Sequence, residues 1–347
     1  MGAYKPRTNN EWGFLGAIAG QTVCATVLDV VVLWKYFGWV TPLVYQVPRS
    51  YSIPVNCGLL LLAVIYQAIL TLDSLRTRNN VQMYNICICN ILLLVLTIMS
   101  YEQTSQVITG LSTARAMGTT PLVNLSIDLW ANVSPVLLSS CVVTGIVSIA
   151  LFFYGYKLHK EFAWAIYRHV SGSRQMRQKF LAYKVLIVMV KMELYLFIAF
   201  LVLYGLVDVH FEVPEFPLTV CLLLAELLQF GLGPYFMKTE NVSGALVVIV
   251  LRVAQIAYLI SRIVLLCGHG PRANTPMKNE MMLYACSSLA FNAIICVNSV
   301  LCTLNFGHGL KPLLAGETKD ARESYQFHNL GYEPVHQFPK SPRFDLE

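Results

Sequence analysis

Four charged residues lie near the middle of long apolar blocks, where an ionised side chain is unusual. Lys191 and Glu193 share one block, and Glu226 and Arg252 each lie in one of the next two. An isolated charge at the centre of a bilayer costs about 2.5 to 3.5 kcal/mol on insertion scales, so such residues usually face a partner or a watery cavity. Because the four charges sum to zero, we interpret them as a structural cluster of ion pairs. A path for a polar solute or for protons is the alternative.

The spacing of these residues indicates which charges can pair. Lys191 and Glu193 are two residues apart, which is about 200° around a helix, so they should not satisfy each other. We therefore expect Lys191 to pair with an acid from another helix and Arg252 to pair with Glu226. Arg262, nearer the outer end of its block, is expected to extend its charged head toward the membrane surface.

The sequence carries no recognised catalytic, nucleotide-binding or metal-binding pattern. It contains no HExxH, no paired intramembrane aspartates of protease type, no DHHC, no GxSxG and no P-loop. The ten cysteines lie in or at the end of apolar blocks without a CxxC pair or a His/Cys cluster, which indicates free thiols rather than disulfides or zinc ligands. We therefore expect no enzyme activity, no cofactor and no metal.

The composition indicates which elements must hold the charged residues. The chain is 56% hydrophobic and only 13% charged, whereas a soluble domain is about a quarter charged. Its apolar blocks are about 20 residues long, enough for a helix to cross a core about 30 Å thick. We predict an all-α, polytopic transmembrane helical bundle of about eight spans, at 13–34, 54–73, 84–101, 135–156, 184–208, 216–237, 243–267 and 281–304. Seven spans is the competing count, because Gln21 and Asp29 weaken the first span and Asn85 and Asn90 weaken the third.

The distribution of positive charge predicts the orientation. With the N-terminus inside, the inside segments hold 16 Lys and Arg residues and the outside loops hold five, and cationic loops resist translocation. We therefore expect a cytoplasmic N-terminus (1–12), a transmembrane domain (13–312) and a disordered cytoplasmic tail (313–347). Both termini are then cytoplasmic.

Three segments outside the spans are candidate contact or modification sites. The basic cytoplasmic loop 157–183 combines Lys and Arg with aromatic residues, which favours a helix lying on an anionic lipid bilayer; a solvated loop and a protein-docking site are the alternatives. In the tail, Tyr332 begins a Tyr-x-x-hydrophobic sequence of the form that trafficking adaptors read. In the outside loop 102–134, Asn124 begins an Asn-x-Ser sequence and is the candidate glycosylation site. The net charge of +6 is explained by topology, so we expect no nucleic-acid partner.

Several segments resemble, in order along the chain, a known family. They are IYQAILTLDSLRTRNNVQMYNICICN (65–90), RQMRQKFLAYKVLIVMVKMELYLFIAF (174–200), VPEFPLTV (213–220) and LNFGHGLK (304–311). Together they are similar to the fungal uncharacterised Golgi apparatus membrane proteins, a multi-pass family of unassigned function. The resemblance implies Golgi residence and a multi-pass helical fold, and it supplies no catalytic residues.

These observations favour one function class over two others. We expect a Golgi-resident integral membrane protein in trafficking or membrane organisation, with its basic loop and tail as contact surfaces. The alternative is a secondary transporter or channel that uses the mid-membrane charges, and a lipid-modifying enzyme is the third class. Transport favours internal structural repeats, and we find no convincing similarity between the two halves of the sequence. The oligomeric state and any ligand stay open.

Overall fold

The computed structural model describes residues 6, 8–41, 48–113, 123–169, 174–209, 215–268, 275 and 277–306. Within these residues the chain forms eight α-helices, each long and apolar enough to cross a membrane. They are α1 (Asn9–Trp39), α2 (Ser52–Thr77), α3 (Asn80–Thr113), α4 (Leu129–His169), α5 (Arg174–Leu203), α6 (Glu215–Thr239), α7 (Val242–Cys267) and α8 (Lys278–Leu304). A 3₁₀ turn, η2 (Pro48–Tyr51), precedes α2, and a π-helical segment, η3 (Tyr204–Asp208), continues α5. The predicted all-α fold is confirmed, with one helix at each of the eight predicted spans.

The segment predicted as a basic loop, 157–183, is mostly helical. α4 continues to His169 and α5 begins at Arg174, because this run contains no Gly or Pro before Gly172. Lys157 and Lys160 also lie over the aromatic rings one turn earlier in α4, 4.2 and 4.5 Å from the ring centroids. The predicted loop therefore contains the end of α4 and the start of α5. The predicted tail, 313–347, lies outside the described residues.

Two other helices also extend beyond their predicted spans. α3 reaches Thr113, inside the predicted outside loop 102–134, because Thr104, Val107, Ile108 and Leu111 are buried at helical spacing and continue its inward face. α1 begins at Asn9, where the Thr8 side chain accepts a hydrogen bond from the backbone N–H of Glu11 and caps the helix. Span prediction misses such extensions because it registers hydropathy and not the polar turns that follow.

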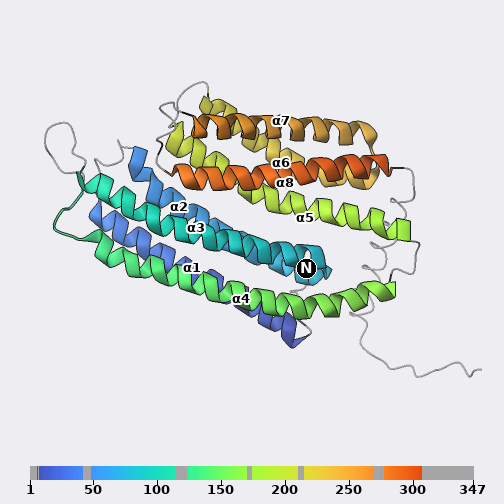
Figure 1. The fold of residues 1–347 in the computed structure, drawn as a ribbon, viewed down its shortest axis with the longest axis horizontal. Helices are drawn as coiled ribbons and strands as arrows, with labels where there is room; N and C mark the ends of the chain where they lie inside the picture. The colour runs from blue at the N-terminus through green and yellow to red at the C-terminus, as the bar shows by residue number, and fades with distance from the viewer. Residues whose placement is uncertain are drawn as a thin grey trace, which may run out of the picture.

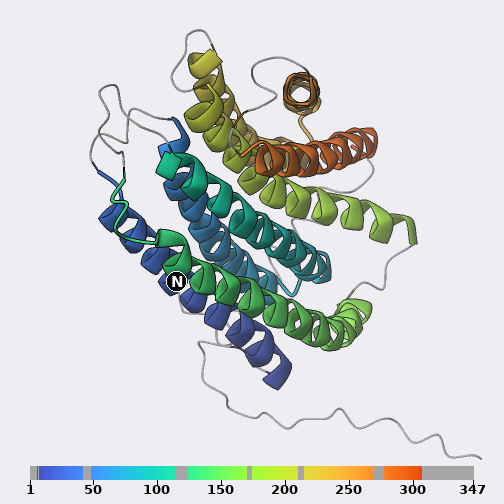
Figure 2. The ribbon, with the colours of Figure 1, turned by 60° about the vertical axis from the view of Figure 1, so that its left-hand side comes forward.

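The eight helices pack as two groups of four, and the arrangement can be followed in Figures 1 and 2. The first group is α1–α4 and the second group is α5–α8. In each group, helices that follow one another in sequence pack side by side, and the first helix packs against the fourth, which closes the ring. The two groups meet mainly where α5 packs against α2 and α3.

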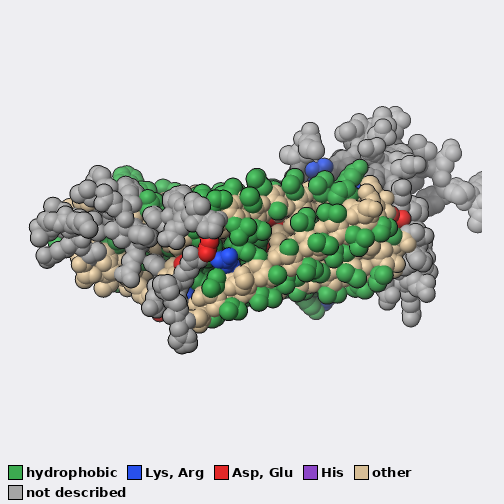
Figure 3. Space-filling model, turned by 90° about the horizontal axis from the view of Figure 1, so that it is seen from above, with side chains coloured by type: hydrophobic (Ala, Val, Ile, Leu, Met, Phe, Trp, Pro, Cys, Tyr) green, Lys and Arg blue, Asp and Glu red, His purple; other side chains and the backbone are tan. Residues whose placement is uncertain are grey.

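The described surface is apolar along the helices, as one face in Figure 3 shows. Large hydrophobic side chains point outward, including Trp34, Ile149 and Leu304, which are 78%, 75% and 71% exposed. Polar and charged side chains such as Glu193, Glu226 and Asn292 are instead fully buried. This distribution, apolar outside and polar inside, is typical of helices in a bilayer. Lipid chains offer no hydrogen bonds to polar groups that face them, so such groups must find partners inside the protein.

Candidate functional site

Three of the four predicted charged residues, Glu193 on α5, Glu226 on α6 and Arg252 on α7, meet inside the second group. Arg252 Nη1 donates hydrogen bonds to Glu193 Oε2 at 2.8 Å and to Glu226 Oε2 at 3.1 Å, and Arg252 Nη2 donates to Glu226 Oε1 at 3.3 Å. The side chains of all three residues are at most 1% exposed. The expected pair of Arg252 with Glu226 is therefore present, and Glu193 shares the same guanidinium.

Three neutral side chains complete this cluster. Gln255 accepts from Arg252 at 3.1 Å and donates to Glu226 at 2.6 Å. Asn292 accepts from Arg252 at 3.4 Å and donates to Glu193 at 3.0 Å, and Ser288 donates to Glu193 at 3.2 Å. We call these six residues the charged hub: Glu193, Glu226, Arg252, Gln255, Ser288 and Asn292. All four helices of the second group contribute to it.

Lys191 lies outside the charged hub, so the predicted cluster of four is wrong in this member. Its ammonium group pairs with Asp73 on α2 at 2.5 Å, which fulfils the expectation of an acid from another helix. The two side chains are 24% and 37% exposed. The two-residue separation from Glu193 turns Lys191 toward the first group, because successive residues point to different faces of a helix.

Arg262 pairs within the protein, whereas the sequence predicted that it would reach for the membrane surface. Its guanidinium donates to Tyr204 Oη at 2.8 Å and to Glu215 Oε2 at 3.2 Å. Tyr204 Oη in turn donates to Glu215 at 2.8 Å. This set links η3, α6 and α7 and is separate from the charged hub.

A second polar cluster, which the sequence did not predict, lies inside the first group. Gln21 from α1 and Gln67 from α2 each donate to Asn90 Oδ1 at 2.9 Å, and Asn90 Nδ2 donates to Ser148 on α4 at 2.8 Å. We call these four residues the amide hub. The sequence did show Gln21 and Asn90 as polar interruptions of apolar blocks. The sequence indicated how deep these residues lie in the membrane, but it did not indicate which face of its helix each residue occupies.

Tyrosines and one ion pair connect the two groups. Tyr66 Oη on α2 donates to the backbone carbonyl of Lys191 at 2.5 Å, and its ring stacks on Tyr195 of α5 at 6.1 Å between centroids. Tyr195 Oη donates to the carbonyl of Leu59 at 3.1 Å. Residues 59, 66 and 73 of α2 recur every seven positions, which places them on one stripe that faces α5.

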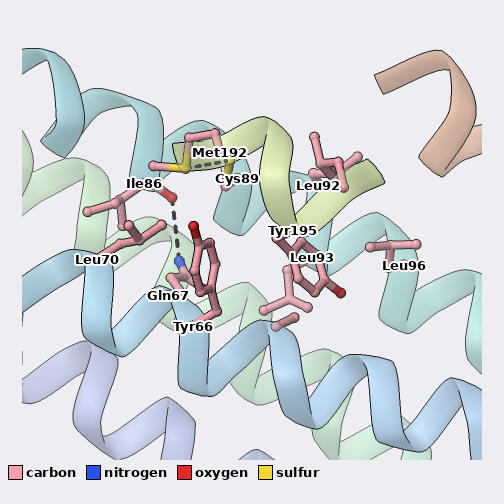
Figure 4. A pocket seen from close by; sticks show the side chains of 12 residues that line it. Tyr66, Gln67, Leu70, Ile86, Cys89, Leu92, Leu93, Leu96, Met192 and Tyr195 are labelled. Carbon is pink, nitrogen blue, oxygen red and sulfur yellow. Dashed lines mark hydrogen bonds between the residues drawn. The ribbon is translucent and has the colours of Figure 1, made fainter. Parts of the chain in front are cut away.

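A small cavity lies beside this contact, between α2, α3 and α5 (Figure 4). Its volume is about 40 Å³, and mainly apolar side chains line it, with Tyr66, Gln67 and Tyr195 as the polar exceptions. A space of this size admits a few waters and excludes a larger solute. Glu193, Glu226 and Arg252 do not line it.

Asn124, the candidate glycosylation site, is exposed in the structure. Its backbone N–H donates to the carbonyl of Trp39 at the end of α1, and its side-chain oxygen accepts from the N–H and hydroxyl of Ser126 at 3.1 and 2.6 Å. Among the described residues no group of three or more His, Cys, Asp or Glu side chains is placed to hold a metal ion. All ten cysteines are free thiols.

The eight long apolar helices define a multi-pass helical membrane protein. The chain is a distant homologue of the UPF0658 Golgi apparatus membrane protein of Schizosaccharomyces pombe, with 20% identity over 274 residues. The matched region covers 75% of this chain and 78% of the relative. No family model matches the chain, and no solved structure matches it.

Proposed function

We propose that this protein resides in the Golgi membrane and serves in trafficking or membrane organisation rather than in catalysis. The observation that carries the proposal is the similarity to a Golgi apparatus membrane protein along 78% of that relative's length. The sequence adds that no catalytic or nucleotide-binding pattern is present. We further propose that both termini face the cytosol, which the distribution of Lys and Arg supports.

The geometry of the charged hub supports this role more than solute transport. Glu193, Glu226 and Arg252 bond to one another and are at most 1% exposed, and the nearby cavity of about 40 Å³ does not reach them. A solute path would instead need charged side chains that line a continuous space. Transport remains the second candidate because the helices fall into two groups of four, and transporters are often built from repeated units.

Localisation of the tagged full-length chain tests the proposal. Tags at residues 1 and 347 should both be digested by protease added to sealed vesicles, and both tagged chains should coincide with Golgi markers. A chain without residues 316–347 should keep normal abundance, and loss of Golgi localisation in this variant would assign sorting information to the tail. Residence of the full-length chain in another membrane would contradict the proposal. Protection of either tag would contradict the orientation.

A further inference from the structure

The two groups of four helices pack in the same way. In both groups the first and fourth helices have the most extensive contact, followed by the third with the fourth, the first with the second, and the second with the third. Since each group crosses the membrane an even number of times, both groups also begin on the same side. The two groups therefore share one helix order and one packing pattern, which the sequence comparison of the halves did not reveal.

Each group contains one polar hub, and in both hubs the central residue comes from the third helix. Asn90 lies ten residues after Asn80, where α3 begins, and Arg252 lies ten residues after Val242, where α7 begins. At 1.5 Å per residue both are about 15 Å along their helices, near mid-membrane. Each is bonded to one polar side chain from each of the other three helices of its group.

The residues around the two centres also correspond in type. The first helix contributes Gln21 in one hub and Glu193 in the other, and the second helix contributes Gln67 and Glu226. Gln and Glu have nearly the same shape and differ in charge. Neutral amides therefore hold one group together where charged side chains hold the other. The ring of four helices does not itself require the charges.

At Arg252 Nη1 more acceptor oxygens converge than there are hydrogens to donate. Arg252 Nη1 carries two hydrogens, yet four oxygens lie within 3.4 Å of it, from Glu193, Glu226, Gln255 and Asn292. Arg252 Nε has no hydrogen-bond partner in the described part of the chain. With both carboxyl groups ionised the hub would carry a net charge of −1 inside the membrane, which is costly because nothing solvates it.

No other charged side chain of the described residues compensates the hub. Lys191 pairs with Asp73 on the face of α5 that meets the first group. Arg262 lies ten residues, or about 15 Å, further along α7 and pairs with Glu215. The acid Glu280 also lies outside the hub. It is about 18 Å before Asn292 along α8 and accepts from Asn56 at 3.3 Å.

We propose that the charged hub binds one proton, held between the carboxyl groups of Glu193 and Glu226. One carboxylate takes up the proton and becomes a carboxylic acid, and the other remains ionised against Arg252, so the hub is neutral overall. The new O–H supplies the missing donor where the two Oε2 atoms converge on Arg252 Nη1. This proton site goes beyond the proposed Golgi role and does not depend on it.

Infrared spectroscopy of the purified full-length protein tests the proposal. The wild-type protein should show the C=O stretching band of a protonated carboxylic acid, and the band should shift in D₂O. Glu193→Gln and Glu226→Gln should each remove the part of this band that belongs to the hub, because one remaining carboxylate with Arg252 is already neutral. The double variant Glu193→Gln with Glu226→Gln should remove no more of the band than either single variant.

Glu280→Gln is the matched control, since it removes a buried carboxyl group outside the hub and should leave the hub's band in place. The triple variant Glu193→Gln, Glu226→Gln, Arg252→Asn copies the amide hub, so it should fold without charge and lack the band even if a single variant fails to fold. A wild-type spectrum without a protonated carboxyl band would overturn the proposal. A band that survives in a hub variant but disappears in Glu280→Gln would overturn it as well.

Discussion

Buried polar side chains in this protein occur in sets that cross helices rather than as isolated groups. The sequence predicted the pair of Arg252 with Glu226 because both lie at the same depth in neighbouring spans. It did not predict that Glu193 shares the same guanidinium and that Lys191 points elsewhere. Hydropathy gives the depth of a residue but not its direction around the helix, because most residues on every face of these helices are apolar.

The amide hub should contribute measurably to stability through Asn90. Asn90→Ala removes three hydrogen bonds and strands the buried Gln21 amide, whereas Gln67 keeps a bond to the Ile86 carbonyl at 3.4 Å, so we expect a loss of about 1–3 kcal/mol in the free energy of unfolding. Asn85→Ala is the matched control on the same helix, because Asn85 is also buried but, among the described residues, its side chain hydrogen-bonds only to Met189 Sδ, at 3.6 Å. Thermal unfolding in detergent measures both. Equal losses would show that Asn90 has no special role.

Among the helices, α5 has the central position because it packs in the second group and against α2 and α3 of the first. The sequence predicted its span correctly but not its neighbours, since an all-round apolar helix does not reveal which face meets which partner. The residues that do mark the contact, Tyr66, Tyr195 and Lys191, are of types common at membrane interfaces, so they carried no distinct signal.

The contact of α5 with α2 should depend more on the half-buried Tyr195 than on the ion pair. Tyr195→Phe removes bonds to the carbonyl of Leu59 and to Tyr284 Oη at 3.1 and 3.2 Å, and should cost about 1–2 kcal/mol. Asp73→Asn weakens the pair with Lys191, which is partly exposed, and should cost less than about 1 kcal/mol. Denaturation of the two variants side by side gives the order. A larger loss in Asp73→Asn would reverse this assignment.

For the whole molecule, hydropathy predicted the eight spans correctly but not their arrangement as two four-helix groups with the same packing order. The groups share helix order and the position of one polar hub, and these features survive when few residues match. Removing the Glu226 carboxylate does not strand Arg252, because Glu193 remains 2.8 Å away.

The central claim is that the mid-membrane charges hold the second group closed and do not line a path. Thermal unfolding of purified Arg252→Gln and Glu226→Gln tests it most directly. Arg252→Gln leaves two buried carboxyl groups without their cation and should lose about 3–5 kcal/mol, whereas Glu226→Gln keeps the pair of Glu193 with Arg252 and should lose less than about 1 kcal/mol. An Arg252→Gln protein as stable as the wild type would contradict the claim, because Glu193 and Glu226 would then not need their buried cation.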